Sequence, residues 1–285
     1  MNENKTNINW YPGHMAKTKR EISEKINLID IVYEVIDARM PISSRIIDLD
    51  NLIKDKKRII IVTKYDLCDK VKTNKLLDEL KRKYDVILID LKNISKKEIN
   101  EIINKTNSLL GYLNESRIKK GLKPRTFRAL VVGAPNVGKS TLINRISGKN
   151  SLKTGNRAGV TKGISWVKIS NTIELMDTPG ILYPKLVSQK VGLNLASLAS
   201  INEDILNKEE IASYIVDYLY HHYKDILIDR YKLDKNIEFD LKYIFEEIAK
   251  NTNSYTKGNV LDIPRVYTII INDLKEGRIK NITFD

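Results

Sequence analysis

The strongest constraint on the fold is a glycine-containing loop near the middle of the chain, with the sequence GAPNVGKS at residues 133–140. It matches the phosphate-loop pattern G-x-x-x-x-G-K-[ST] at every fixed position. The apolar, β-branched run at 128–132 predicts a buried strand before the loop, and the spacing at 140–146 predicts a helix after it. Such a loop presents several backbone N–H groups to phosphate oxygens at a helix N-terminus. The sequence therefore predicts a nucleoside triphosphate site.

Two side chains of this loop have chemistry that suits a triphosphate. Lys139 is expected to reach the β- and γ-phosphates, and the hydroxyl of Ser140 is expected to ligate Mg²⁺. The alternative is a chance glycine-rich turn, but strand, loop, Lys-Ser pair and helix stand in the right order for a phosphate loop. We expect the nucleotide to contact Asn136, Val137, Gly138, Lys139, Ser140 and Thr141.

The composition narrows the class of protein and its partners. A chain of 285 residues with 42% apolar residues is long enough for a large α/β domain and a smaller second domain. A formal net charge of +13 favours a polyanionic partner, although nucleotide bias in the genome also enriches Lys, Asn and Ile. A polar N-terminus, a single cysteine and no apolar run near the ~20 residues of a membrane span predict a cytoplasmic protein without stable membrane association. Nothing in the sequence indicates a dimer seam, so a monomer is expected.

Strands and helices alternate before the phosphate loop. Apolar runs predict strands at 30–37, 58–62 and 85–89, and helical spacing predicts helices at 17–29, 73–84 and 95–113. A basic linker is expected at 117–125. This alternation predicts a mostly parallel sheet with helices on both faces.

The pattern changes after the phosphate loop. A strand pair is expected at 164–169 and 172–176, and helical spacing then dominates at 205–223, 241–248 and 266–274. We therefore place a domain boundary near residue 185. The prediction is a nucleotide-binding domain at 1–185 and an all-helical domain at 186–285 that binds RNA.

A second phosphate-site motif follows the phosphate loop. Asp177 stands at the end of an apolar strand in the sequence DTPG, where an acid holds Mg²⁺ and the N–H of Gly180 can sense the γ-phosphate. Between the two motifs, the loop at 155–163 contains Thr161, which we expect to ligate Mg²⁺ when the γ-phosphate is present. Because both stretches follow a phosphate loop in the order typical of nucleotide triphosphatases, the assignment of each as part of the phosphate site is stronger than it would be alone.

A third motif concerns the choice of base. Guanine offers two hydrogen-bond donors on one edge, N1–H and the N2 amino group, so a carboxylate can select it. The stretch 63–66 follows an expected strand and resembles the guanine-reading motif of GTPases, usually Asn-Lys-x-Asp. Asp66 would pair with guanine and the stem of Lys64 would cover its face. The first position departs from the pattern, and the expected contacts are Thr63, Lys64, Tyr65 and Asp66.

The guanine motif precedes the phosphate loop, which reverses the usual order. In this the chain resembles the circularly permuted GTPases, and within them the ribosome biogenesis GTPase A group. The matching segments are 10–17 (WYPGHMAK), 37–41 (DARMP), 63–66 (TKYD), 133–141 (GAPNVGKST), 159–161 (GVT) and 177–180 (DTPG).

This resemblance implies a fold, an activity and partners. The fold would be a circularly permuted P-loop GTPase domain followed by a small all-helical domain. The protein would bind GTP and GDP with Mg²⁺, act late in the assembly of the large (50S) ribosomal subunit, and leave after hydrolysis. Lys92 and Asn93 would occupy the segment that meets guanine O6, where the family usually has a serine.

The resemblance also bears on how GTP is cut. Ile181 and Leu182 follow the DTPG motif where many GTPases have a water-orienting glutamine. The family implies His14 as the catalytic group, because a near-neutral pKa suits water positioning or proton transfer. The alternative is that His14 only packs at the N-terminus. Asn136 is typical of relatives that bind K⁺ beside the phosphates, so K⁺ is a possible second cation.

A different class of function stays open at this point. The chain could be a GTP-binding scaffold with negligible hydrolysis that acts on another RNA or at a membrane surface. In the helical part, four tyrosines could stack on RNA bases or belong to the core, and they are Tyr214, Tyr218, Tyr220 and Tyr223. Binding to the large subunit and GTP turnover with and without it would separate the two functions.

Overall fold

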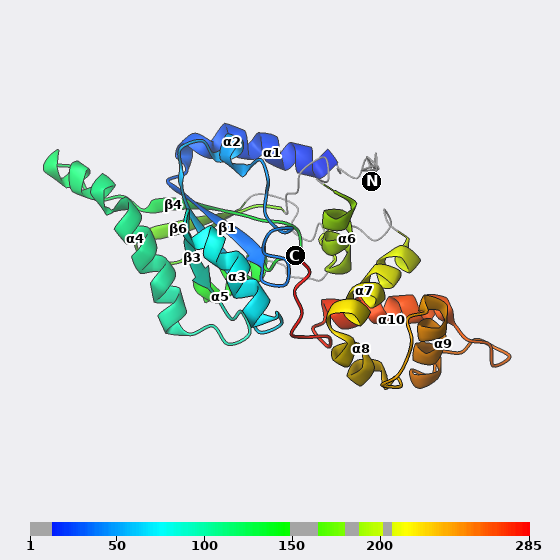
Figure 1. Cartoon of the computed structure of the whole chain (residues 1–285). Helices are drawn as coiled ribbons and strands as arrows, with labels where there is room; N and C mark the ends of the chain where they lie inside the picture. Colours follow the sequence, from blue (N-terminus) through cyan, green and yellow to red (C-terminus); the bar gives the residue numbers. More distant parts are fainter. Residues whose placement is uncertain (1–12, 149–164, 180–187, 202–206) are drawn as a thin grey trace.

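The computed structural model describes residues 13–148, 165–179, 188–201 and 207–285. A six-stranded sheet has the order β3-β2-β1-β4-β6-β5 (Figure 1). All neighbouring strands are parallel except β5, which runs antiparallel to β6 at the edge. The strands are β1 (Ile31–Asp37), β2 (Lys57–Thr63), β3 (Asp85–Leu88), β4 (Phe127–Val132), β5 (Ser165–Lys168) and β6 (Ile173–Asp177).

The strand order shows the circular permutation. β1 pairs with β2 on one side and with β4 on the other, so the first three strands lie on one side of the phosphate-loop strand. The register places Asp37 beside Thr63 and Val131 beside Asp177. The carboxyl ends of the parallel strands therefore meet at one edge of the sheet, where open α/β sheets bind ligands. The predicted α/β architecture is confirmed.

Helices cover both faces of the sheet, because alternate side chains of each strand point to opposite faces. One face packs against α4 (Lys96–Lys119) and α5 (Lys139–Ser147), and its buried residues include Tyr33, Ile61 and Val131. The other face packs against α1 (Gly13–Lys25), α2 (Leu49–Ile53) and α3 (Lys70–Lys81). Apolar side chains fill both layers, so β1 is buried along its whole length and β2, β4 and β6 are buried over most of theirs.

The helix ends differ from the predicted ranges for local reasons. α3 begins at Lys70, before the expected residue 73, because the side chain of Asp69 accepts hydrogen bonds from the N–H groups of Val71 and Lys72. α4 begins after a capping box formed by Ser95 and Glu98. It continues to residue 119, so the first part of the expected basic linker is helical. The short α2 was not predicted.

The C-terminal part is helical, as expected. It contains α6 (Gln189–Ser197), α7 (Lys208–His222), α8 (Lys224–Tyr231), α9 (Leu241–Asn251) and α10 (Ile263–Lys275), of which α6 and α8 were not predicted. Figure 1 shows α7 to α10 grouped at one end of the molecule, beside the α/β part. The proposed boundary near residue 185 lies outside the described residues and stays a prediction. None of the described helices has the length and apolar character needed to cross a membrane.

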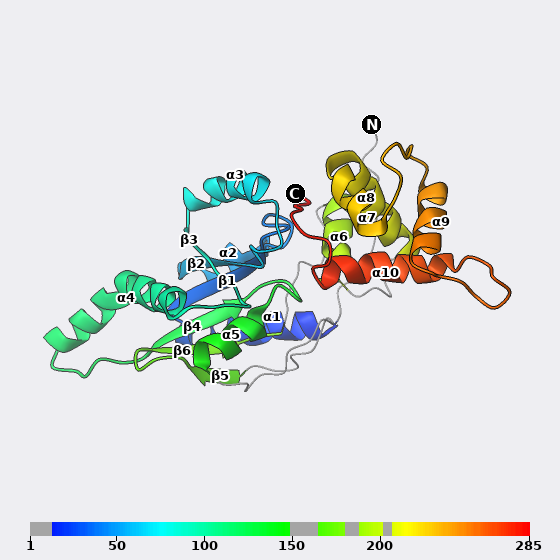
Figure 2. The ribbon, with the colours of Figure 1, turned by 90° about the horizontal axis from the view of Figure 1, so that it is seen from below.

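The last residues of the chain run between the two parts (Figures 1 and 2). The N–H of Phe284 donates to the carbonyl of Arg39 at 2.8 Å, and the N–H of Asn281 donates to the carbonyl of Leu67 at 2.8 Å. The ring of Phe284 is fully buried and lies 4.8 Å from the ring of Tyr218 on α7. This C-terminal segment, residues 279–285, thus packs the α/β part against the helical part.

Candidate nucleotide site

The phosphate loop joins β4 to α5, as predicted, and two of its glycines are needed for its shape. A Cβ at Gly133 would collide with the carbonyl oxygen of Val35 on the neighbouring strand. Gly138 precedes α5 with φ +102°, a left-handed conformation that other residues rarely adopt. The loop therefore delivers its backbone to the N-terminus of α5, where a phosphate is favoured by unpaired N–H groups and by the helix dipole.

Lys139 lies buried under this loop. Its ammonium donates to the carbonyl oxygens of Ala134 at 2.8 Å and Gly133 at 3.1 Å. Burial lowers the pKa of Lys139 to about 8, although the nearby Asp177 acts in the opposite direction. A buried cation whose hydrogen-bond acceptors among the described residues are carbonyl oxygens is well placed to gain from a phosphate oxygen.

Ser140 and Asp177 come together beside Lys139. The Ser140 hydroxyl lies 3.4 Å from Asp177 Oδ2. Burial raises the pKa of Asp177 to about 6, despite the charge of Lys139. Asp177 Oδ1 is buried without a hydrogen-bond partner among the described residues. A hydroxyl and a carboxylate with an unsatisfied oxygen are suitable ligands for Mg²⁺, which prefers oxygen and keeps several waters.

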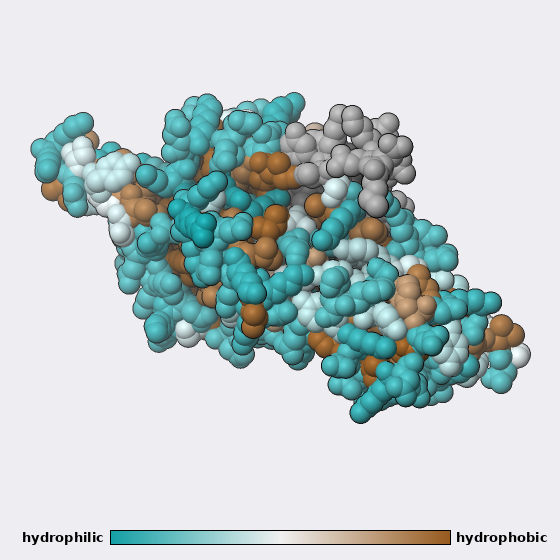
Figure 3. All heavy atoms as spheres, viewed as in Figure 1, coloured by the Kyte–Doolittle hydropathy of each residue, from teal (hydrophilic) through white to brown (hydrophobic). Residues whose placement is uncertain are grey.

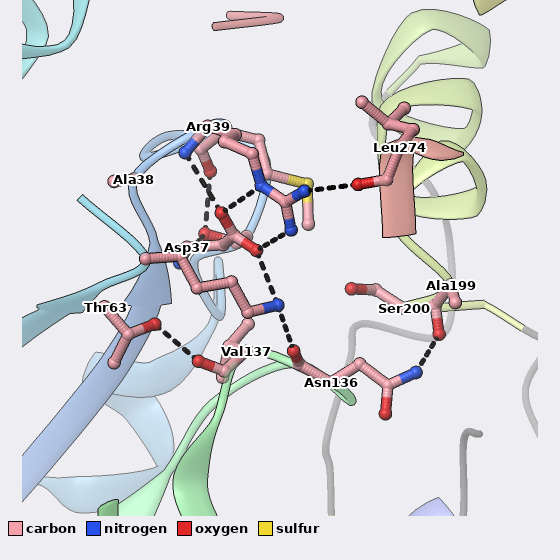
Figure 4. A network of polar contacts seen from close by, with 12 residues as sticks. Asp37, Ala38, Arg39, Thr63, Asn136, Val137, Ala199, Ser200 and Leu274 are labelled. Atoms are coloured by element: carbon pink, nitrogen blue, oxygen red, sulfur yellow. Dashed lines mark hydrogen bonds and ion pairs between the residues drawn. The ribbon is translucent and has the colours of Figure 1, made fainter. Parts of the chain in front are cut away.

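The guanine motif packs directly against the phosphate loop. The hydroxyl of Thr63 donates to the carbonyl of Val137 at 2.5 Å, and the ammonium of Lys64 donates to the carbonyl of Asn136 at 2.6 Å (Figure 4). The Thr63 hydroxyl also lies 3.1 Å from the Ile36 carbonyl. The residue that departs from the usual Asn therefore still fastens this motif to the phosphate loop.

Asp66 and the following loop lie on the same side. The carboxylate of Asp66 pairs with the ammonium of Lys92 at 2.9 Å and is partly exposed. Asp90 shapes the loop, because its carboxylate accepts from the N–H groups of Lys92 and Asn93 and from the Asn93 side chain. The segment expected to meet guanine O6 is thus beside the expected guanine-reading carboxylate. Tyr65 points elsewhere, since its hydroxyl donates to Asn74 on α3.

The sequence did not reveal that the segment after α6 also touches the phosphate loop. The amide nitrogen of Asn136 donates to the carbonyl of Ala199 at 2.5 Å, and the hydroxyl of Ser200 donates to the carbonyl of Pro135 at 2.8 Å. Asn136 adopts a left-handed conformation with φ +61°. These are contacts of short polar side chains with backbone carbonyls, for which the sequence has no periodic signal.

Several expected site residues lie outside the part of the chain that the structure describes. Thr161 and Gly180 belong to undescribed segments, as do Ile181 and Leu182. α1 begins at Gly13, but the side chain of His14 is also outside the described residues. The expected roles of His14, Thr161 and Gly180 therefore stay predictions. Val137 and Thr141 lie in the loop and in the first turn of α5, and Val137 is fully buried.

Comparison with known proteins gives consistent results. The family model described as 50S ribosome-binding GTPase matches residues 128–250. The protein named ribosome biogenesis GTPase A from Bacillus cereus is 38% identical over 98% of this chain and 93% of its own length. The protein of the same name from Bacillus licheniformis is 39% identical over 98% of both chains. A more distant one from Thermotoga maritima is 28% identical over 98% of this chain.

Solved structures agree with these relatives. GNP-bound YlqF from T. maritima shares 27% sequence identity with a TM-score of 0.64, and the match covers 94% of this chain and 97% of that chain. A GDP-bound YlqF matches equally, at 27% identity and a TM-score of 0.64. The permuted sheet, the phosphate loop and these full-length relatives lead to one conclusion: this chain is a GTP-hydrolysing enzyme that belongs to the ribosome biogenesis GTPase A family.

Proposed function

We propose that this GTPase is a factor for late assembly of the large (50S) ribosomal subunit, which it binds in its GTP state and leaves after hydrolysis. One observation carries the proposal that the protein binds a guanine nucleotide. The groups expected to bind phosphate and Mg²⁺ lie at the same end of the strands as those expected to bind guanine, and they are Lys139, Ser140 and Asp177 for the first and Lys64 and Asp66 for the second. The ribosomal part is supported by the names of relatives that align over nearly the full chain.

In this proposal the guanine base lies between the loops after β2 and β3. Asp66 accepts hydrogen bonds from N1–H and the N2 amino group, and the stem of Lys64 covers one face of the base. Lys92 pairs with Asp66 Oδ2 at 2.9 Å, so guanine would compete with Lys92 for this carboxylate. Lys92 and Asn93 would then present the loop backbone to guanine O6.

The phosphates lie over the N-terminus of α5. Lys139 exchanges its carbonyl acceptors for β- and γ-phosphate oxygens, and the loop residues Asn136 to Thr141 contribute backbone N–H groups and the helix start. Ser140 and Asp177, together with Thr161, would hold Mg²⁺, which neutralises charge on the phosphates when bound. The N–H of Gly180 would detect the γ-phosphate.

Hydrolysis in this proposal depends on a group outside the DTPG motif, because apolar residues follow that motif. His14 would orient or deprotonate the attacking water, and the subunit would bring it into place, so turnover is slow without the subunit. Asn136 would ligate K⁺ through its side-chain oxygen and thereby add positive charge near the transition state. Equal turnover in Na⁺ and K⁺ buffers would remove the K⁺ role.

The surface suits an RNA partner bound through its phosphates. The chain carries 49 Lys and Arg against 36 Asp and Glu, and the face in Figure 3 is largely hydrophilic, with apolar areas small and separate. The end of α4 projects beyond the sheet and leads into a segment with several Lys and Arg residues (Figure 1). Such contacts release counterions, so we expect strongly salt-dependent binding.

The four tyrosines of the helical part all form hydrogen bonds within the protein. Tyr218 is buried, and its hydroxyl donates to the carbonyl of Thr283. Tyr214, Tyr220 and Tyr223 donate to Asn194, to the Ile237 carbonyl and to Asp69, respectively. These hydroxyls make contacts within the protein, and base stacking by the partly buried rings of Tyr214, Tyr220 and Tyr223 stays a prediction.

Sedimentation with purified 50S subunits tests the proposal. The protein should co-sediment with a non-hydrolysable GTP analogue and much less with GDP, and a rise in salt should weaken the binding. Subunits should also accelerate GTP turnover. A protein that neither binds the subunit in either nucleotide state nor responds to it in turnover would contradict the ribosomal function, while its GTPase activity would stand.

A further inference from the structure

The end of β1 and the loop after it, residues 37–44, contain a buried group of charges that the nucleotide site alone does not explain (Figure 4). Asp37 is 1% exposed and accepts hydrogen bonds from the backbone N–H, Nε and Nη2 of Arg39 at 2.9 to 3.0 Å. The same carboxylate pairs with the ammonium of Lys64 at 2.9 Å. Asp37 therefore holds two cations, and one of them belongs to the guanine motif.

Arg39 reaches in the other direction, to the helical part. Its Nη1 donates to the carbonyl of Leu274 at 2.8 Å, in the last turn of α10 (Figure 4). A cation is favoured there, because the C-terminus of a helix carries partial negative charge, and the Leu274 carbonyl can accept from Arg39 in addition to the N–H of Gly277. The carbonyl of Arg39 also accepts from the N–H of Phe284 in the C-terminal segment. One residue thus contacts both α10 and the segment that follows it.

The charges in this group depend on one another. Arg39 is 1% exposed, so its guanidinium has exchanged water for Asp37 and Leu274. Burial acts to raise the pKa of Asp37, but Arg39 and Lys64 hold it well below its usual range. Removing Asp37 leaves two buried cations without their carboxylate, which is strongly unfavourable. Removing Arg39 leaves Asp37 with Lys64 as its ion-pair partner among the described residues, so the charge balance around Lys64 changes. A displacement of α10 from Arg39 would therefore change the hydrogen bonds and ion pairs of Asp37 and Lys64.

We propose that Asp37 and Arg39 are positioning residues that couple guanine nucleotide binding at Lys64 to the docking of α10 on the α/β part. The inference rests on the guanine role proposed for Lys64. Lys64 is shared between Asp37 and the carbonyl of Asn136 in the phosphate loop. A nucleotide that fixes Lys64 and this loop favours the arrangement in which Asp37 holds Arg39 and Arg39 holds Leu274. By linkage, docking of α10 must then favour the nucleotide by the same factor.

A second contact also connects the phosphate loop to the helical part. The side chain of Asn136 donates to the carbonyl of Ala199, directly after α6, and α6 packs against α7 and α10. Among the described residues, two routes therefore join the phosphate loop to the helical part. One runs from the Asn136 carbonyl through Lys64, Asp37 and Arg39, and the other runs through the contacts of the loop with residues 199 and 200. Because both routes begin in the same loop, ordering of that loop by phosphate acts on both.

Hydrogen exchange of the unaltered protein is the first test. The N–H groups of residues 276–279 donate to carbonyls of residues 272–274, so their exchange reports on the end of α10. Saturating GDP should slow this exchange by about fivefold or more, within the usual range of coupling between sites. Exchange that is the same with and without GDP, while GDP binding is verified in the same sample, would overturn the inference.

Substitution supplies the second test. Arg39→Lys keeps the charge but cannot donate to both Asp37 and Leu274 in the same geometry. We expect GDP binding to weaken about tenfold and the α10 amides to exchange faster even at saturating GDP. The matched control is Arg45→Lys, because Arg45 makes a similar two-point pair with Glu34 but lies on the face covered by α2. The control should leave GDP affinity and α10 exchange unchanged.

A double-mutant cycle separates positioning from a loss of general stability. If Arg39 acts on the nucleotide through Lys64, Arg39→Lys should weaken GDP binding much less in a Lys64→Ala background than alone. Strictly additive effects would contradict the proposed route. If Arg39→Lys does not fold, the exchange test on the unaltered protein still decides the question.

The two proposals fail in different ways. A chain that shows no preference for GDP over ADP would refute the guanine role of Lys64 and Asp66. A chain that selects GDP but shows no response at α10 would refute only the coupling.

Discussion

The hydroxyl of Thr63 lies 2.5 Å from the carbonyl oxygen of Val137, and this bond joins the guanine motif to the phosphate loop. It identifies what the first position of the motif requires: a short polar side chain that can donate to the loop backbone. A threonine satisfies that requirement here in place of the usual Asn. The two halves of the nucleotide site, separated by about seventy residues, are therefore held together by a buried side chain.

Replacement of Thr63 by the isosteric valine should loosen this junction. Thr63→Val removes the donor and leaves the buried Val137 carbonyl without it, at a cost of about 1–3 kcal/mol in stability. We also expect GDP affinity to fall roughly tenfold, because the loop that binds phosphate loses its anchor. Urea unfolding and fluorescent GDP titration measure the two effects.

Thr106→Val provides the matched control for this change. Thr106 is a buried threonine whose hydroxyl bonds to Tyr33 and to the Ile102 carbonyl, remote from the phosphate loop. It should lower stability by a similar amount and leave GDP affinity intact. If both variants weaken GDP binding equally, the Thr63 effect is only a loss of stability.

Lys139→Ala should separate binding from folding. Burial disfavours the charged ammonium and offsets part of its two bonds to carbonyls, so its removal should lower the free energy of unfolding without nucleotide by no more than about 1–3 kcal/mol. Binding of GDP and GTP should weaken by at least about 2–4 kcal/mol, because charge-assisted bonds to phosphate are lost. Calorimetric titration and thermal unfolding of the same samples check both expectations. Retained affinity would rule out a phosphate contact for Lys139.

The raised pKa of Asp177 predicts that the stability of the protein without nucleotide and Mg²⁺ depends on pH. Burial raises its pKa to about 6 from a usual value near 3.8, so the folded state holds this proton more tightly than the unfolded state. The contribution of Asp177 to stability is therefore most favourable below pH ~4 and declines as pH rises towards ~6, by roughly 1–3 kcal/mol. Asp177→Asn should lack this component and be more stable than the original protein at pH 7.

The difference between the two proteins in urea unfolding from pH 4 to 7 isolates the Asp177 component from other titrating groups. A difference that does not vary over this range would contradict the raised pKa. The same substitution should abolish the effect of Mg²⁺ on GDP affinity, which is measured separately at pH 7.5.

The C-terminal segment is expected to contribute strongly to stability through one ring. Phe284 is fully buried against Tyr214 and Tyr218, so Phe284→Ala should cost about 3–5 kcal/mol. Phe239→Ala is the control, since Phe239 is 40% exposed and lies against Tyr220 and His221. It should cost less than about 1 kcal/mol. Equal losses in urea unfolding would show that the C-terminal segment does not hold the two parts together.

Sequence patterns predicted the sheet and the phosphate loop well, because both depend on local signals. The strands are continuous apolar runs, and the loop is a short motif with fixed glycines at positions such as Gly138. The motif order further predicted the permutation, which the strand order confirms.

Contacts between distant segments could not be predicted in the same way. The bond from Arg39 to Leu274 joins residues 235 positions apart, and neither residue has spacing that indicates the other. The contacts of Ala199 and Ser200 with the phosphate loop depend on backbone carbonyls, which every residue has. α6 and α8 are short, so their periodic signal was too weak to separate them from loops.

The position of β1 between β2 and β4 has a consequence for how the chain folds during its synthesis on the ribosome. Chains emerge from the N-terminus, and their first segments begin to fold before the last are made. A nascent chain that ends before β4 can pair β1 with β2 and β2 with β3, but the side of β1 that later pairs with β4 stays open. That edge is a template for unwanted strand pairing until β4 is synthesised. Because of the permuted order, the strands that carry the guanine motif are synthesised before the strand that carries the phosphate loop. The exposed side of β1 is therefore covered only when β4 has been made.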